Sequence, residues 1–568
     1  MVAEGFRILT GRHRTLTPPA PPAPLSLPRE RGELILSAHD TVWLVGVAAG
    51  VLLLCGLPYV VSALWGPPAL QRIGTFWFSR DFSQYQAAMR EGASHSGWLI
   101  HDHFSAEPHA AAFMYPLYVT AGKLSALLGI SNLATFITLE WLGRLAVVGA
   151  TYLFAATFLA LRRQRRLAVL LTLGTLGLDA LTAPLRLLLD GAGVHALDGL
   201  LPESINPYLE MSSFGVLLSA PHLMLGLALT LVCAPLYFRA IAGRWFWTAL
   251  LGAAVLGLSL VHPFNAPTLV SVLGIHALLT SRRAWPAAIV AGLAVTPAAL
   301  YSLLLYQLDP FWSGTYGIQN IMPASPPWSV VLDYGLVLLA APLAWSVVRR
   351  WPSERRRLLM LWVGLGLLWM YAPVPYQRRF AFGVQPALAV LAAAGLFEMN
   401  AWLRRHEVRR LWRRLINYGA VIAGISTALL VYVSLVASAM LNSPSEVYLW
   451  SSAEAAGAAW LGEHSTAADV VLTSTEFGNP LGGAIDGRVV HGHIVATLRS
   501  DQKAAWVKQF YAVDTPPGER ADIVRLSGAT IIALGPRERA LGALSLDSQP
   551  GLDLVYDRDG VQFFRVGR

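Results

Sequence analysis

Long apolar runs constrain this chain more than any other feature of its sequence. They are about 17 to 28 residues long, the length that an α-helix needs to cross a hydrocarbon core of roughly 30 Å. A transmembrane β-barrel would instead show short strands of alternating polarity. Of the 568 residues, 55% are hydrophobic and only 14% are charged, which excludes a cytosolic globular protein. The sequence therefore predicts a polytopic α-helical membrane protein.

The apolar runs predict eleven membrane spans, and the arginines predict their orientation. We expect the spans near 42–65, 133–161, 167–187, 211–238, 245–262, 265–280, 285–307, 328–348, 357–372, 380–398 and 416–440. The stretch 110–130 is also apolar, but counting it as a span would place the four arginines between 162 and 166 outside. We interpret it as a helix in the membrane interface, because almost all Arg-rich loops then lie inside.

This orientation explains most of the net charge of +9, so the sequence predicts no nucleic-acid partner. Lysine occurs only at positions 123, 503 and 508, and the preference for arginine indicates a GC-rich bacterial genome. We therefore expect a protein of the bacterial cytoplasmic membrane with a cytoplasmic N-terminus. Cys55 and Cys233 both fall in predicted spans, which indicates neither a disulfide framework nor a metal-binding CxxC motif.

Composition divides the chain into three expected regions. Residues 1–38 are rich in Arg and Pro and predict a disordered cytoplasmic tail. Residues 39–440 form the transmembrane module, with an amphipathic first outer loop at 66–132. An odd number of spans leaves 441–568 outside as a soluble extracytoplasmic α/β domain. Its patterns predict strands at 470–473, 488–490, 530–533, 554–556 and 561–564, and helices at 452–464 and 501–511.

The first outer loop holds the first candidate site residue, Asp81. Phe82, Tyr85 and Met89 recur at helical spacing, so an amphipathic helix should begin at Asp81 and rest on the outer membrane surface. Asp81 has two compatible interpretations. One is the N-cap of this helix, with Gln84 completing a capping box. The other is a general base that takes a proton from an acceptor hydroxyl.

A second cluster in the same loop contains His101, Asp102, His103, Glu107 and His109. One interpretation is a set of solvated interface residues. A second is a metal site, although the spacing matches no closed zinc motif and Pro108 interrupts any helix. A third makes Asp102 a second catalytic or sugar-orienting carboxylate. A divalent metal is thus possible but not required, and the sequence assigns no cofactor and no metal ligand.

Arg378 and Arg379 lie in a loop that the map places outside, against the charge rule. Adjacent arginines present forked donors that suit the oxygens of a lipid phosphate or diphosphate. The alternatives are snorkelling toward ordinary headgroups and pairing with an external carboxylate.

Several polar residues are expected inside the membrane. Glu140 and Arg144 lie one helical turn apart and should pair, because each alone would cost about 3 kcal/mol at the centre of a span. His222 and His262 fall in the outer halves of their helices. They either line a common cavity or form hydrogen bonds between helices.

Several short motifs follow one another in order over most of the chain. They are Asp81 with Tyr85, Pro116-Leu117-Tyr118, Gly129-Ile130-Ser131 and Arg144, and in the tail Ala459-Trp460-Leu461, Val470-Val471-Leu472-Thr473-Ser474, Phe477-Gly478-Asn479 and Gly492-His493. In this order they resemble the GT-C superfamily of membrane glycosyltransferases, which includes protein O-mannosyltransferases and lipid A aminoarabinose transferases. The resemblance implies inverting transfer of a sugar from a polyprenyl-phosphate donor at the outer membrane face, with Asp81 as the base.

Two features depart from that family. Phe82 follows Asp81 where an acidic pair is usual, and Met114-Tyr115 precede the Pro-Leu pair where a His-Pro-Pro-Leu block is usual. An oligosaccharyltransferase is less similar, because only Asp333-Tyr334-Gly335 is present of its Trp-Trp-Asp-Tyr-Gly motif, and that lies at the end of a span.

The expected enzyme takes a polyprenyl-phosphate-linked sugar as donor, contacts membrane lipids, and acts on an acceptor that the sequence does not identify. Arg378 and Arg379 are expected to bind the donor phosphate, and Asp81 and Asp102 to be catalytic. The expected substrate-cavity residues are Tyr85, His103, Glu107, His109, His222 and His262. The alternative is a membrane transporter or lipid-binding scaffold without catalysis.

Overall fold

The structure is a computed structural model that describes residues 37–67, 69–191, 209–318, 321–441, 448–542, 546, 549 and 551–567. The predicted disordered tail lies outside the described residues except for positions 37 and 38. Contacts join the described residues, from 37 to 567, into one compact unit.

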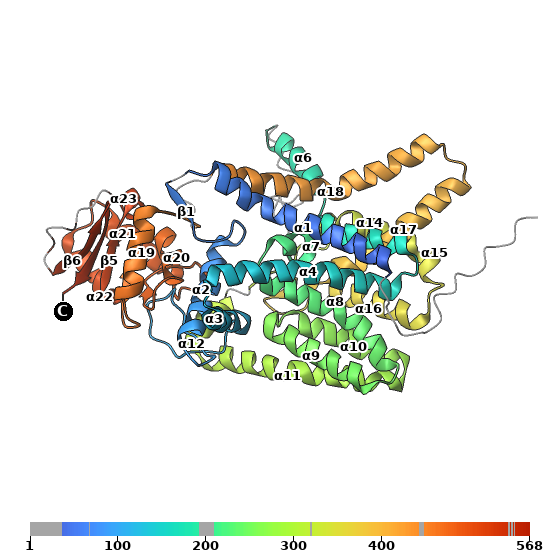
Figure 1. Ribbon diagram of the computed structural model, residues 1–568, viewed down its shortest axis with the longest axis horizontal. Coiled ribbons are helices and arrows are strands. Elements are labelled where there is room, and N and C mark those ends of the chain that lie inside the picture. The colour runs from blue at the N-terminus through green and yellow to red at the C-terminus, as the bar shows by residue number, and fades with distance from the viewer. Residues whose placement is uncertain are drawn as a thin grey trace, which may run out of the picture. The chain divides into compact units, whose positions relative to one another are not determined.

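Helices dominate the chain before residue 442 (Figure 1). They are α1 (Ala38–Trp65), α2 (Ser79–Ser94), α3 (Pro116–Leu128), α4 (Asn132–Phe158), α5 (Arg162–Gly174), α6 (Asp179–Gly191), α7 (Ser213–Leu218), α8 (Pro221–Ile241), α9 (Trp245–Val261), α10 (Asn265–Thr280), α11 (Trp285–Leu308), α12 (Pro310–Trp312), α13 (Ser329–Tyr334), α14 (Leu336–Ala340), α15 (Trp345–Val348), α16 (Ser353–Trp369), α17 (Val384–Arg405) and α18 (Arg410–Leu441). Helix α8 packs against α4 and α9, α11 packs against α9, and α1 runs beside α18.

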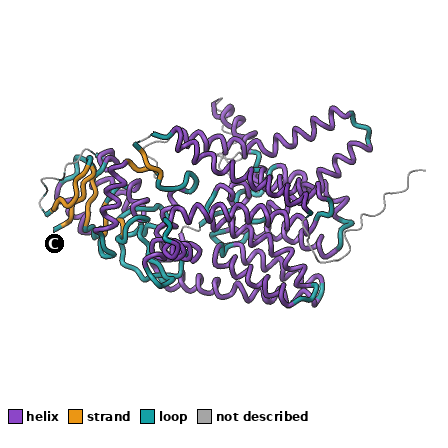
Figure 2. The backbone as a smooth tube through the Cα atoms, in the orientation of Figure 1, coloured by secondary structure: helices purple, strands orange, loops and turns teal. Residues whose placement is uncertain are grey.

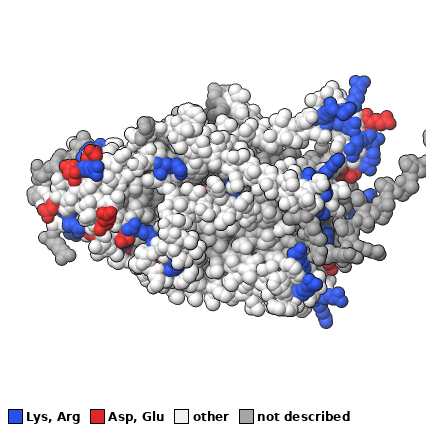
Figure 3. Space-filling model, viewed as in Figure 1, with Lys and Arg blue, Asp and Glu red and all other residues white. Residues whose placement is uncertain are grey.

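Six described segments are long and apolar enough to span a membrane. They are Ala38–Trp65, Asn132–Phe158, Pro221–Ile241, Arg282–Leu308, Gln377–Arg405 and Arg410–Met440. On α11, Ile289, Leu293 and Leu303 leave more than half of their surface exposed, an arrangement that lipid favours and water does not. On the face shown in Figure 3, the surface over the helices is almost free of charge, and Lys and Arg gather at one end. These are the features of an integral membrane protein.

Some predicted spans are broken in the structure. The stretch 328–348 was predicted as one helix, and this prediction is wrong, because α13, α14 and α15 divide it. Between the first two, Gly335 adopts a φ of +53°, which ends the α-helical hydrogen-bond ladder. Gly177 lies directly opposite, where a Cβ would come within 2.5 Å of the Leu332 carbonyl oxygen. Glycine at these two positions therefore lets the backbones touch where the predicted spans 328–348 and 167–187 break.

Two other expectations about the helices hold. Helix α3 has 13 residues, or about 20 Å of length, which is too short to cross the membrane and agrees with excluding 110–130 from the spans. Glu140 and Arg144 pair on α4, with 3.3 Å between Glu140 Oε2 and an Arg144 guanidinium nitrogen, and both side chains are buried. The predicted pairing is confirmed.

The C-terminal segment, residues 448–567, combines helices and strands at one end of the described chain (Figure 2). Its elements are β2 (Leu449–Ser451), α19 (Ser452–His464), β3 (Val470–Leu472), α20 (Thr475–Gly482), β4 (Arg488–Val489), α21 (Ser500–Tyr511), α22 (Pro517–Ser527), β5 (Ile531–Leu534), α23 (Pro536–Leu541), β6 (Leu552–Arg558) and β7 (Val561–Val566). Each predicted strand overlaps an observed one, and both predicted helices are present. The short helices α20, α22 and α23 were not predicted.

A five-stranded sheet organises this segment, in the order β4-β3-β5-β7-β6. β3 is parallel to β4 and β5, whereas β7 is antiparallel to β5 and β6. Successive side chains of a strand point to opposite faces. Val471 accordingly packs with residues of α19 and α20, and Leu472 packs with residues of α21 and α22 on the other face.

The segment predicted as the first outer loop, a name kept below, is joined to the C-terminal segment by backbone pairing. Strand β1 (Leu70–Arg72) lies antiparallel to β2, with Leu70 opposite Ser451. A single bridge also pairs Ser105 with His491. The two regions, far apart in sequence, therefore pack as one structure, and this junction positions the candidate site.

Candidate functional site

A cavity of about 900 Å³, the central cavity, lies where the first outer loop meets the helices. Its lining comes from α2, α3, α8, α11, the turn between α9 and α10, and the 3₁₀ helix η5 (Gln377–Ala381). One residue of the C-terminal segment, Val495, also contributes. The cavity contains Asp81, Tyr85, His222, His262, Arg378 and Arg379. Six sequence-predicted site residues are therefore brought together from four separate parts of the chain.

Asp81 lies in the first turn of α2, but it does not cap the helix. The helix begins at Ser79, and its N-cap is Phe78 in a left-handed conformation with φ +55°. Gln84 does not complete a capping box, since its Oε1 accepts a hydrogen bond of 2.8 Å from the Tyr115 hydroxyl. The capping interpretation is therefore wrong. The Asp81 side chain is instead 28% exposed at the cavity, with Oδ1 3.0 Å from His493 Nε2.

Aromatic side chains form the cavity wall next to Asp81. Tyr85 follows Asp81 by one helical turn and stacks on Tyr118 with 4.3 Å between ring centroids. The Tyr118 hydroxyl lies 2.9 Å from His222 Nδ1. His262 stacks on Phe382 at 4.7 Å, and neither of its ring nitrogens has a hydrogen-bond partner among the described residues.

The two arginines differ in their surroundings. Arg378 Nε lies 3.3 Å from Glu210 Oε2, so a carboxylate pairs with it, as one of the alternatives expected. Arg379 lies over the ring of Phe264, with its guanidinium carbon 4.6 Å from the ring centroid. Its Nε is buried without a hydrogen-bond partner in the described part of the chain. Arg378 is thus engaged by a carboxylate, whereas the Arg379 guanidinium contacts an aromatic ring.

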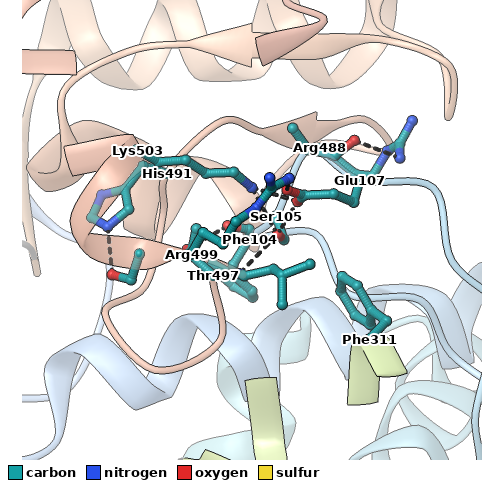
Figure 4. Close-up of polar contacts among 12 residues, drawn as sticks. Phe104, Ser105, Glu107, Phe311, Arg488, His491, Thr497, Arg499 and Lys503 are labelled. Carbon is teal, nitrogen blue, oxygen red and sulfur yellow. Dashed lines mark hydrogen bonds and ion pairs between the residues drawn. The ribbon is translucent and has the colours of Figure 1, made fainter. Parts of the chain in front are cut away.

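Asp102, His103, Glu107 and His109 do not line the central cavity. They lie instead where the first outer loop packs against the C-terminal segment. Figure 4 shows Glu107 facing Lys503 and Arg499 of that segment. Burial alone would raise the pKa of Glu107, but hydrogen bonds from Lys503 and Ser105 outweigh it and lower the pKa. Glu107 thus serves as a charged link between the two regions.

The two histidines of this cluster also make structural contacts. His103 Nδ1 lies 2.8 Å from the Gly487 carbonyl oxygen, and its Nε2 lies 3.0 Å from Glu91 Oε1. His109 stacks on Phe311 with 3.8 Å between ring centroids, and its Nε2 accepts a hydrogen bond from the Asp102 amide. Burial lowers the pKa of His109 to about 4. Neutral His109 can therefore keep accepting that bond at neutral pH.

Asp102 is fully enclosed at this junction. Its Oδ1 accepts a hydrogen bond of 2.5 Å from the Phe104 amide, and its Oδ2 has no partner among the described residues. Burial raises the pKa of Asp102 to about 7. The side chain holds the backbone at Phe104 in place and is separated from the cavity that contains Asp81.

The Asp102→Asn variant is expected to gain thermal stability over the wild type as pH rises. The raised pKa means that the folded chain holds a proton that the unfolded chain releases. The stabilisation that this bound proton provides is complete below pH 3.8, the pKa of the unfolded aspartate. It is lost as pH rises to about 7, the pKa of Asp102 in the folded chain. Asparagine keeps the acceptor for Phe104 and cannot ionise. Melting temperatures of both proteins in detergent, measured from about pH 5 to about pH 8, check this; a difference that is independent of pH would contradict it.

Sequence reasoning missed two members of the site. His493, which contacts Asp81, was noted only as part of the Gly492-His493 motif, and Glu210, which pairs with Arg378, was not singled out. The only sequence signal for His493 was that motif in the tail. Among the described residues, no group of three or more His, Cys, Asp or Glu side chains is placed to hold a metal ion.

Comparisons with known proteins identify the fold. No protein-family model and no curated protein sequence matches the chain. The oligosaccharyltransferase of Archaeoglobus fulgidus, tethered to an acceptor peptide, matches with a TM-score of 0.51 and 11% identity over 93% of this chain and 74% of that one. Arabinofuranosyltransferase AftD from Mycobacteria matches with a TM-score of 0.51 and 16% identity over 94% of this chain and 42% of that one.

ArnT of Cupriavidus metallidurans, bound to undecaprenyl phosphate, matches with a TM-score of 0.47 and 13% identity over 93% of this chain and 98% of that one. The first two matches show that the chain has the fold of GT-C glycosyltransferases, as the sequence resemblance implied. At these identities they show the fold alone.

Proposed function

We propose that this protein is an inverting glycosyltransferase that moves a sugar from a polyprenyl-phosphate-linked donor to an acceptor at the outer face of the membrane. The observation that carries the proposal is a single cavity that contains both a carboxylate, Asp81, and the cations Arg378 and Arg379. Direct displacement at an anomeric carbon needs a base on the acceptor and a stabilised leaving group. The shared fold with two glycosyltransferases supports the same reaction class.

Asp81 is the proposed general base. Its carboxylate takes the proton of the acceptor hydroxyl as that oxygen forms a bond to the anomeric carbon. The bond between this carbon and the phosphate oxygen breaks, and the polyprenyl phosphate leaves with the electron pair. The configuration at carbon inverts because attack and departure occur on opposite faces. Asp81 suits this role because it is partly exposed to the cavity and its single hydrogen bond among described residues leaves Oδ2 open.

Arg379 is the proposed main contact of the leaving phosphate. Its guanidinium lies on Phe264, and the residue lines the central cavity, so its positive charge can meet an incoming phosphate there. Arg378 adds positive charge beside it but is already engaged by Glu210. Charge on the phosphate grows as the bond breaks, so these cations should accelerate the reaction more than they tighten binding.

The rest of the cavity suits a lipid-linked sugar. Apolar side chains such as Leu223, Leu260 and Ala298 come from spanning or adjacent apolar helices and offer a path for a polyprenyl tail. His222 and His262 are proposed to contact the sugar hydroxyls. The proposal assigns no reacting atoms to Asp102, His103, Glu107 or His109, which hold the first outer loop against the C-terminal segment, and it requires no metal.

Deletion of the gene should cause one polyprenyl-phosphate-linked sugar to accumulate, because its consumer is missing. Mass spectrometry of extracted membrane lipids measures this, and the mass identifies the sugar and the carrier. Expression of the wild-type protein should remove the accumulated lipid. If the lipid profile does not change, or if an acceptor lipid accumulates on one side of the membrane without loss of its glycosylation, the transporter alternative gains support.

A further inference from the structure

The side chain that contacts Asp81 comes from the C-terminal segment. His493 Nε2 lies 3.0 Å from Asp81 Oδ1, across a sequence separation of 412 residues. The His493 side chain is 4% exposed, whereas that of Asp81 is 28% exposed. His493 therefore approaches Asp81 from the protein side and leaves the cavity side of the carboxylate open.

The backbone around His493 determines which ring nitrogen carries the proton. The amides of Val495 and Ala496 both point to His493 Nδ1 at 3.3 Å. A nitrogen that faces two N–H donors must accept, so the proton of the neutral imidazole is on Nε2 and is donated to Asp81. A neutral donor fixes the carboxylate without cancelling its negative charge, whereas a cationic partner would weaken it as a base.

The loop that carries His493 is itself held by the first outer loop. The Thr497 hydroxyl accepts a hydrogen bond from the His493 amide at 3.2 Å and donates one to the Phe104 carbonyl at 2.6 Å; Figure 4 shows Phe104 and Thr497 side by side. A Cβ on Gly492 would come within 2.9 Å of the Phe104 ring, so only glycine allows this close approach. The residues before and after His493, Gly492 and Thr497, both contact Phe104, and these contacts fix the position of His493.

We infer that His493 is a positioning residue that holds the Asp81 carboxylate in the orientation needed to receive the acceptor proton. The inference rests on the proposed function. It assigns the C-terminal segment a part in the reaction: the loop 493–497 supplies both the orienting hydrogen bond and, through Val495, part of the cavity wall. Asp102 acts one step further away, through its bond to the Phe104 amide.

The test uses the full-length protein and compares His493→Ala with His493→Gln. Turnover is measured as release of polyprenyl phosphate from the lipid-linked sugar extracted from the deletion strain, and binding is measured with undecaprenyl phosphate. His493→Ala is expected to lower kcat about tenfold to a hundredfold, the effect of losing one hydrogen bond to a charged group, with the Kd for undecaprenyl phosphate unchanged. His493→Gln is expected to recover most of the loss, because its amide can donate from nearly the same place.

His491→Ala is the matched control. His491 is equally buried in the same part of the chain, but its ring contacts Thr475 and Ser500, not Asp81. Wild-type kcat in His493→Ala, or an equal loss in His491→Ala, would overturn the inference, as would a failure of glutamine to rescue a folded protein. Activity in Asp81→Asn would instead refute the proposed base, so the two failures can be told apart.

Discussion

Asp81→Asn is expected to abolish sugar transfer while leaving the protein folded. General-base catalysis contributes about 10² to 10⁴ in rate, and asparagine cannot accept the acceptor proton. The substitution is otherwise conservative, because the asparagine Oδ1 can still accept the hydrogen bond from His493 Nε2 that is 3.0 Å long in the wild type. The measurement is release of polyprenyl phosphate from the extracted lipid-linked sugar, alongside binding of undecaprenyl phosphate and the melting temperature.

Asp486→Asn serves as the matched control for this change. Asp486 lies in the C-terminal segment and pairs with Arg90 of α2 at 2.8 Å, but it is half-exposed and does not line the central cavity. Asp486→Asn therefore tests how much activity and stability change when an aspartate at the same junction is neutralised outside the cavity. Substantial turnover by Asp81→Asn would remove Asp81 from the base role, whereas loss of undecaprenyl phosphate binding would show that the substitution disturbs the cavity.

The second large effect is expected at Arg379. Arg379→Ala should lower turnover by about 10² to 10³, the effect of removing one group that stabilises developing charge, with a much smaller change in the Kd for undecaprenyl phosphate. Arg379→Lys should recover only part of the activity, because lysine keeps the charge but lacks the planar fork that lies on Phe264 and can grip two phosphate oxygens. Steady-state kinetics with the extracted donor separates kcat from KM.

Arg378 allows an internal comparison. Its guanidinium is already paired with Glu210, so Arg378→Ala should reduce turnover less than Arg379→Ala does. Arg378→Ala also leaves the Glu210 carboxylate without this partner. The double variant Arg378→Gln/Glu210→Gln removes both charges, so comparing it with Arg378→Ala separates the effect of an unpaired carboxylate from the effect of losing the cation. Arg405→Ala, which removes an ion-paired arginine outside the cavity lining, controls for loss of charge alone. Equal effects at Arg378 and Arg379 would contradict the distinction drawn between them.

Each of the six described segments long enough to span a membrane overlaps one of the eleven predicted spans, because a membrane span is a local property of about 20 consecutive side chains. Prediction from the sequence failed where tertiary contact decides the backbone, as at Gly335, whose break depends on the close approach of Gly177. The helix after Asp81 was predicted from local periodicity, but its start was placed too late. No local pattern indicated that Phe78 would adopt the left-handed conformation that lets α2 begin at Ser79.

The same limit applies to the site. Asp81, Arg378 and Arg379, which line one cavity in the structure, were singled out because each is anomalous at its own position, either in a crowded loop or against the charge rule. The only local signal for His493 was the Gly492-His493 motif, which says nothing about Asp81; the contact between the two side chains exists only in the folded chain. The cluster around Asp102 and Glu107 attracted attention through its density of ionisable groups. In the folded chain these groups hold the junction with the C-terminal segment and do not line the central cavity.

The distance in sequence between Asp81 and His493 has a consequence for synthesis of the protein. The ribosome delivers Asp81 to the membrane early and His493 more than 400 residues later. A nascent or truncated chain that has inserted its helices therefore lacks both the contact between His493 and Asp81 and the part of the cavity wall that Val495 supplies. Chains that end before residue 493 are expected to insert their helices without completing the site proposed around Asp81.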